Sequence, residues 1–224
     1  MKILQGFNYL FGSFFNKAGT RINHSLLYLN RKRTIDRNYM DYIRLSALEL
    51  AANEINKNGI EGSTAELGVY KGKFARYINQ YFPHRKLFLF DTFEGFNETD
   101  IHIEQKESFS MGEQDFTDTS VTEVLKRMPH PLQCVVKKGF FPETAEGVEE
   151  EFVFVSIDAD LYSPILSGLN FFYPRLKKGG YIFVHDYNND GYKGAKQAVE
   201  EYCKAHDVRC TPLPDAGGTA IIVK

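Results

Sequence analysis

The stretch Phe152-Val-Phe-Val-Ser-Ile-Asp-Ala-Asp-Leu161 indicates the fold of this chain. Five of its first six residues are apolar, and the run then ends in two carboxylates, Asp158 and Asp160. A short apolar run of this kind is typical of a strand buried on both faces of a parallel sheet. Residues 180–187 repeat the pattern, because a second apolar run ends there in an acid, Asp186.

Residues 162–178 separate the two runs and are long enough for one crossover helix. The two strands are therefore expected to be parallel, with their acidic ends on the edge of the sheet where ligands bind in open α/β folds. A single acid there can equally cap a helix, and Ser163-Pro164 is typical of a helix start. Three acids on two strand ends repel one another unless a cation or a proton offsets them, which favours a ligand site.

Composition limits the possible classes of protein. The 224 residues, 43% of them hydrophobic, predict one large α/β domain. A formal net charge of -2 gives no reason to expect nucleic acid as a partner. Three widely spaced cysteines without a C-x-x-C pair argue against disulfides and structural zinc, and favour the cytoplasm.

The first part of the chain is interpreted separately. Residues 1–38 are predicted to be an N-terminal helical extension, followed by a single domain over residues 39–224. Residues 1–15 contain no apolar run near the roughly 20 residues that a transmembrane helix needs. Two interpretations stay open: a helix that packs on its own domain, or a contact surface for a homodimer or a membrane.

Strand and helix patterns alternate along the rest of the chain, which predicts a doubly wound sheet. Residues 94–119 are the exception, because they are polar and aperiodic. They are predicted to be a long mobile loop of the kind that closes over a ligand. The expected helices cover residues 41–58, 73–81, 121–128, 162–178 and 191–206, and the expected strands residues 64–68, 87–91, 132–137, 152–157, 180–185, 208–212 and 219–223.

The turn after the first strand indicates a nucleoside ligand without phosphates. Gly68 and Gly72 do not form the three-glycine pattern that binds a pyrophosphate, and Glu66 just before them would repel one. Asp91 ends the second strand, where an acid can bind both hydroxyls of a ribose. S-adenosylmethionine, an adenosine with an amine and a sulfonium, fits these features.

Five segments together resemble the macrocin-type (TylF-like) sugar O-methyltransferases. The resemblance runs from about Tyr39 to Asp190 and implies a class I, S-adenosylmethionine-dependent fold. That fold is a Rossmann-like sheet of seven mostly parallel strands, the last one antiparallel. The segments are Ala65-Glu-Leu-Gly-Val-Tyr-Lys-Gly72, Phe90-Asp-Thr-Phe-Glu-Gly-Phe96, Gly139-Phe-Phe-Pro-Glu-Thr144, Ile157-Asp-Ala-Asp-Leu-Tyr162 and Gly179-Gly-Tyr-Ile-Phe-Val-His-Asp-Tyr187.

The resemblance also implies roles for single residues. It places the methionine end of the cofactor beside the glycine turn, the ribose at the end of the second strand and the adenine after the third strand. Asp160 is implied as the general base. The implied cofactor residues are Glu66, Gly68, Tyr70 and Gly72 at the turn, Asp91 and Thr92 at the ribose, and Gly139 and Phe140 at the adenine.

The implied metal ligands are Asp158 and Asp186, with His185 where the family usually has another Asp. Carboxylates favour Mg²⁺, and the imidazole leaves Mn²⁺ as an alternative. The metal would activate a hydroxyl of a small-molecule or glycan acceptor, and Asp160 would take its proton. A glycosyltransferase that uses Asp158-Ala-Asp160 as a D-x-D motif is the alternative, although Glu66 and Asp91 disfavour the phosphates of its donor.

Overall fold

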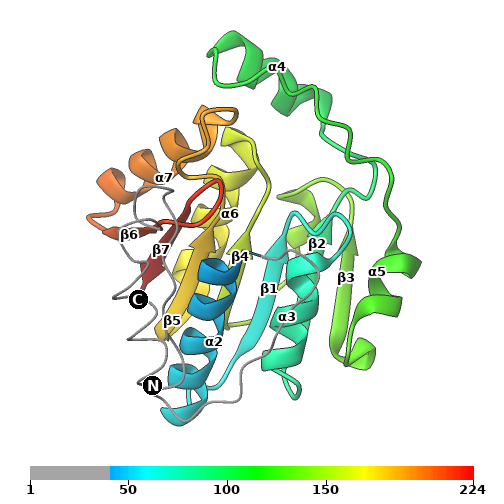
Figure 1. The fold of residues 1–224 in the computed structure, drawn as a ribbon, viewed down its shortest axis with the longest axis vertical. Helices are drawn as coiled ribbons and strands as arrows, with labels where there is room; N and C mark the ends of the chain where they lie inside the picture. The colour runs from blue at the N-terminus through cyan, green and yellow to red at the C-terminus, as the bar shows by residue number, and fades with distance from the viewer. Residues whose placement is uncertain (1–40) are drawn as a thin grey trace, which may run out of the picture. The chain divides into compact units, whose positions relative to one another are not determined.

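The computed structural model describes residues 41–224, and their seven strands form one sheet in the order β3-β2-β1-β4-β5-β7-β6 (Figure 1). All neighbouring pairs from β3 to β5 are parallel, whereas β7 is antiparallel to both β5 and β6. The predicted sheet with an antiparallel last strand is therefore confirmed. The strands are β1 Ser63–Leu67, β2 Leu87–Asp91, β3 Cys134–Lys138, β4 Phe152–Ile157, β5 Leu176–Val184, β6 Cys210–Leu213 and β7 Thr219–Val223.

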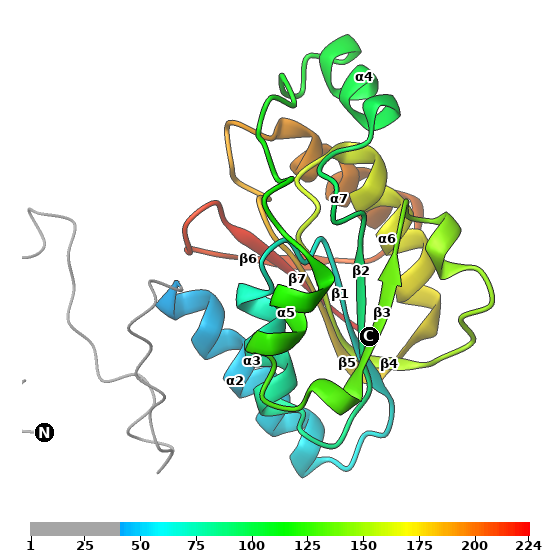
Figure 2. The same cartoon turned by 90° about the vertical axis from the view of Figure 1, so that its right-hand side faces the viewer.

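Helices cover both faces of this sheet, as Figure 2 shows. On one face, α2 (Tyr42–Lys57), α3 (Lys73–Tyr81) and α5 (Val121–Arg127) bury their apolar side chains in one hydrophobic cluster. On the other face, α6 (Tyr162–Arg175) and α7 (Lys193–Ala205) pack in a second cluster. Burial on both faces explains why the central strands read as continuous apolar runs.

The chain sets the start of α2 with a side-chain cap. Asp41 Oδ1 accepts hydrogen bonds from the backbone N–H of Ile43 at 2.7 Å and of Arg44 at 3.2 Å. These bonds satisfy N–H groups that have no partner inside the helix. The predicted helix start at residue 41 is therefore confirmed.

The prediction for residues 94–119 was wrong in part, because Glu98–Lys106 form a helix, α4. The helix begins after Asn97, whose side chain accepts from the N–H of Thr99. Its buried residues are two acids, Asp100 and Glu104, rather than an apolar stripe. A search for apolar periodicity therefore could not find it. In both ribbon views α4 stands beyond the end of the sheet, apart from the two helical layers.

The predicted helical extension over residues 1–38 lies outside the described residues, and so does its suggested contact with a partner or a membrane. Within residues 41–224, no helix is long and apolar enough to cross a membrane.

Candidate active site

A cavity opens at the carboxyl ends of β1, β2 and β4, on the edge predicted to bind ligand. Eight of the predicted site residues line it: Gly68, Tyr70, Asp91, Thr92, Gly139, Phe140, Asp158 and Asp160. The structure thus brings the end of β1, the end of β2, the segment after β3 and the end of β4 together in one wall. The other four, Glu66, Gly72, His185 and Asp186, do not line the cavity.

Gly68 allows the turn after β1 to lie directly against the end of β4. Its φ is +82°, and a Cβ atom at this position would lie 2.0 Å from the carbonyl oxygen of Asp158. Gly72 has a packing role instead, since a Cβ there would lie 2.9 Å from side chains of Met128 and Val124. Its contact with a cofactor stays a prediction.

Asp91 is held by backbone N–H groups of two different turns. Its Oδ2 accepts from Val69 at 2.6 Å and from Tyr70 at 2.8 Å, and its Oδ1 accepts from Phe93 at 2.6 Å. A carboxylate offers about four acceptor positions, so capacity remains for a ligand hydroxyl. Asp91 therefore fixes the glycine turn and still faces the cavity with an acceptor.

Glu66 lies inside β1, with 1% of its surface exposed. Burial and the negative charge of Asp158 raise the pKa of its carboxyl well above the ordinary value. Its Oε2 has no hydrogen-bond partner. Glu66 thus lies behind the cavity wall, next to the acids at the end of β4, and its predicted contact with the cofactor is untested.

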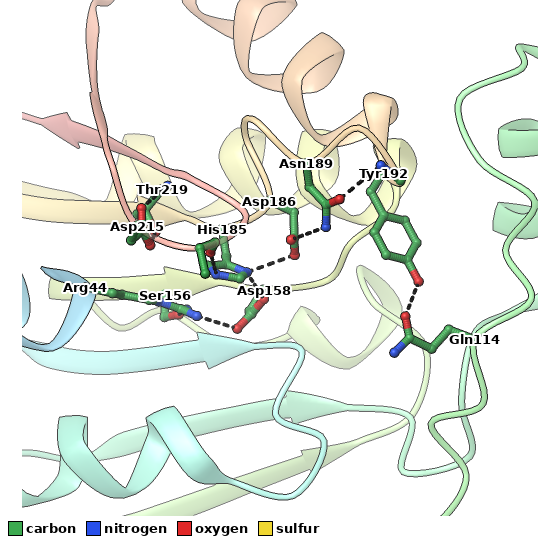
Figure 3. A network of polar contacts seen from close by, with 12 residues as sticks. Arg44, Gln114, Ser156, Asp158, His185, Asp186, Asn189, Tyr192, Asp215 and Thr219 are labelled. Atoms are coloured by element: carbon green, nitrogen blue, oxygen red, sulfur yellow. Dashed lines mark hydrogen bonds and ion pairs between the residues drawn. The ribbon is translucent and has the colours of Figure 1, made fainter. Parts of the chain in front are cut away.

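The three predicted metal ligands converge at the ends of β4 and β5. Each of Asp158, His185 and Asp186 offers a donor atom, and these atoms all lie within 4.8 Å of one another. His185 Nδ1 lies 2.9 Å from Asp186 Oδ2 and 3.1 Å from Asp158 Oδ1, and Figure 3 shows its ring between the two acids. Its Nε2 lies 3.2 Å from the carbonyl oxygen of Ala216. Both ring nitrogens thus face oxygens, the arrangement of an imidazolium.

Electrostatics agree with this geometry. Although burial opposes a positive charge, Asp158 and Asp186 raise the pKa of His185 to about 10. Burial also opposes the ionisation of Asp158, but Arg44 and His185 hold the pKa of that carboxyl well below its usual range. A protonated His185 offsets part of the negative charge of the acids around it.

Arg44 is a member of this cluster that the sequence analysis missed. From α2, its Nη1 donates to Asp158 Oδ2 at 2.9 Å and its Nη2 to Ser156 Oγ at 3.2 Å (Figure 3). Its guanidinium stacks 3.9 Å from the ring centre of Phe74. A signal existed in the sequence, because Arg44 shares the buried face of α2 with Leu48 and Ala51. A charged residue on an apolar helix face needs a buried partner.

Asp160 differs from its neighbours because no cationic side chain of residues 41–224 forms an ion pair with it. Burial, the charges of Asp158 and Asp186 and a hydrogen bond with Asp186 raise its pKa well above the ordinary value. A carboxyl with a raised pKa is a stronger proton acceptor once it is ionised. Its φ of +58° directs the chain sharply away from β4 into α6.

Residues 94–119 cover the cavity and bond to both of its ends. The rings of Phe116 and Phe96 belong to a row of edge-to-face contacts that begins at Tyr70 and ends at Tyr192. The distances between successive ring centres are 4.9 Å, 5.0 Å and 6.4 Å. Tyr70 Oη donates to Asp118 at 2.5 Å, and Tyr192 Oη donates to Gln114 at 2.7 Å. This segment therefore contacts the glycine turn of β1 and the start of α7 together.

Residues 35–223 match the family model of macrocin-O-methyltransferase (TylF). The chain belongs to the macrocin O-methyltransferase family. The match covers β1 to β7 together with the cavity and its acids, so the predicted family is confirmed. The chain is an S-adenosylmethionine-dependent O-methyltransferase. The glycosyltransferase alternative finds no support.

Two relatives are O-methyltransferases by name, and the name of the first contains a rhamnosyl group. It is 23% identical, over 80% of its length and 71% of the relative's, to 8-demethyl-8-(2,3-dimethoxy-alpha-L-rhamnosyl)-tetracenomycin-C 4'-O-methyltransferase from Streptomyces olivaceus. It is 26% identical, over 74% and 69%, to mycinamicin III 3''-O-methyltransferase from Micromonospora griseorubida.

Solved structures show the same fold. The O-methyltransferase NovP has a TM-score of 0.66 at 22% identity, with 81% of this chain and 79% of NovP covered. The calicheamicin methyltransferase CalS11 also has a TM-score of 0.66, at 19% identity, with 89% and 82% covered.

Proposed function

We propose that this enzyme methylates a hydroxyl group of a sugar with the help of one divalent cation. The observation that carries the proposal is the convergence of Asp158, His185 and Asp186. Asp158 joins this cluster to the cavity, which Asp91 and Asp160 also line. The proposed sites for the methyl donor and for the cation would thus lie on one edge of the sheet.

The β1–β2 end of the cavity is the proposed binding site of the cofactor. Asp91 keeps an acceptor for the ribose hydroxyls, and Thr92 shapes the next turn by donating to the carbonyl of Gly95 at 2.6 Å. The turn at Gly68 and Tyr70 would lie beside the methionine part, and Gly139 and Phe140 beside the adenine. A wall that carries acids suits a cofactor that bears a sulfonium and an amine.

The residues at the β4–β5 end fit a divalent cation. Two carboxylates are hard ligands that suit Mg²⁺, whereas an imidazole is a borderline ligand. This site should therefore prefer Mn²⁺ more than a site of three carboxylates would. Arg44 holds one oxygen of Asp158 and leaves the other directed at His185. A bound cation would lower the pKa of a coordinated sugar hydroxyl. His185 would give up the proton on Nδ1 when it becomes a ligand.

Asp160 is proposed as the base that accepts the proton of the hydroxyl as its oxygen attacks the methyl group. Its raised pKa supports this role. Residues 94–119 would exclude water and hold the acceptor against the methyl donor. Hydrogen bonds and ring contacts join this segment to the rest of the domain at both ends of the cavity. We propose that these contacts break when the segment opens for exchange of ligands.

Incubation with isotopically labelled S-adenosylmethionine and a panel of glycosides, nucleotide-sugars and phenols tests the proposal. We expect label to enter sugars only when Mg²⁺ or Mn²⁺ is present, and a chelator to stop the transfer. Transfer to phenols alone, or transfer that a chelator does not change, would contradict it.

A further inference from the structure

Asp100 is a buried residue whose carboxyl group has no hydrogen-bond partner among residues 41–224. The residue is 7% exposed, lies in the first turn of α4 and lines the same cavity as Asp91. Within residues 41–224 no hydrogen bond reaches its side chain. Glu104, one turn further along the helix, has hydrogen-bond partners for its carboxylate. Its two oxygens accept from the N–H of Tyr162 at 2.7 Å and from Ser110 Oγ at 2.7 Å.

Leaving a buried carboxyl unpaired costs free energy, so its position needs a reason. Burial and the charge of Glu104 raise the pKa of Asp100 to about 6, which reflects that cost. An acid in the first turn of a helix stabilises the helix by interacting with its dipole, but the exposed Glu98 already makes this interaction. A hydrogen-bond donor from a ligand in the cavity would supply the missing partner.

The cavity that Asp100 lines is also lined by Asp91, Gly139 and Phe140, the residues proposed to lie beside the ribose and the adenine. The cavity wall also carries apolar side chains that suit the faces of a purine ring. These are Phe140, Phe141, Leu161 and Pro164.

The donors of the cofactor can be assigned in turn. The ribose hydroxyls match the acceptor that Asp91 leaves open, and the ammonium of the methionine part belongs with the turn at Gly68. The exocyclic amine of the adenine is then the donor without an acceptor.

We infer that Asp100 accepts a hydrogen bond from this amine, so that α4 recognises the base of the cofactor. The inference rests on the proposed placement of S-adenosylmethionine in the cavity. It makes Asp100 a specificity-determining residue of the cofactor site.

Three ligands test the inference by calorimetric titration. They are S-adenosylhomocysteine, its analogue with unsubstituted purine in place of adenine, and its 7-deazaadenine analogue, which keeps the amine. The wild type should bind the unsubstituted purine analogue about 10–100-fold more weakly than the parent, the range for a hydrogen bond to a charged group. The 7-deaza analogue should bind like the parent.

The variant Asp100→Ala should bind all three ligands with similar affinity, because the acceptor is gone. Asp100→Asn keeps a carbonyl oxygen and should retain part of the preference for the amine. Glu98→Ala, which removes an exposed acid from the same helix turn, should behave as wild type. An equal preference in wild type and Asp100→Ala would overturn the inference. Failure of the wild type to bind any of the three would instead overturn the placement of the cofactor.

Discussion

The two ends of the cavity stabilise their carboxylates in different ways. At the β1–β2 end, Asp91 is held by three backbone N–H groups. At the β4–β5 end, side-chain cations do this work, since Arg44 and His185 pair with Asp158 and His185 also pairs with Asp186. Asp160 forms no ion pair with either cation.

This difference indicates what each end needs from a ligand. Backbone dipoles are fixed by the fold, so the β1–β2 end is ready for a cofactor without another ion. The β4–β5 end has more negative than positive groups, and His185 supplies its cation only while protonated. A divalent ion would replace that proton and offset the charge of Asp160. The predictions below alter one end at a time.

Replacement of the proposed base should have the largest effect. Asp160→Asn should lower turnover by roughly 10²–10⁴-fold at saturating metal, because the amide cannot take a proton. Calorimetry should show unchanged affinity for S-adenosylhomocysteine. Asp190→Asn, an exposed acid after β5, serves as the control. Recovery of turnover at high Mg²⁺ would show that Asp160 is a metal ligand and not the base.

At the opposite end, Asp91→Asn should weaken S-adenosylhomocysteine binding by roughly 10–100-fold. An amide offers one acceptor oxygen where the carboxylate offers two, and its N–H₂ group would face backbone donors. Metal affinity should not change. Glu94→Gln is the neighbouring control, since its carboxylate is exposed and pairs with Lys138. Equal loss of cofactor binding in both variants would refute the ribose assignment.

The role of His185 predicts a pH dependence of metal binding. Its pKa of about 10 means that a metal must displace a proton at all lower pH values. The apparent dissociation constant for Mn²⁺ should therefore rise by up to about tenfold for each unit that the pH falls below 10. His185→Asp should flatten this dependence, whereas exposed His84→Ala should keep it. The same slope in wild type and His185→Asp would exclude His185 as a ligand.

The smallest predicted effect concerns Asp100 in the absence of ligands. Its pKa is raised from 3.8 to about 6 in the folded protein, so the folded state binds the proton more tightly than the unfolded state. Stability of the wild type should then fall as the pH rises through this window. Asp100→Asn, which does not titrate, should raise Tm by up to about 4 °C above pH 6 and leave it unchanged near pH 4. A lower Tm of this variant at high pH would mean that the carboxylate stabilises the fold.

The sequence predicted the sheet edge well because its signals are local. The apolar runs of β2 and β4 end in Asp91 and Asp158, which line the cavity, and the register of parallel strands brings the strand ends together. The charged Arg44 on the apolar face of α2 was a usable signal, but its partner Asp158 could not be assigned because it is 114 residues away. Helix α4 was missed because its buried residues are acids instead of apolar side chains. The sequence also could not show that Glu104 is hydrogen-bonded and Asp100 is not, because this difference depends on tertiary contacts.

The central claim is that the two ends of the cavity bind different ligands independently. Calorimetric titration of S-adenosylhomocysteine into the metal-free enzyme, in a chelator and again with saturating Mn²⁺, tests it most directly. The account predicts nearly equal cofactor affinity under both conditions, together with a single Mn²⁺ site that Asp158→Asn weakens and Asp91→Asn does not. Loss of cofactor binding in the chelator, or an Mn²⁺ affinity that Asp158→Asn leaves unchanged, would contradict it.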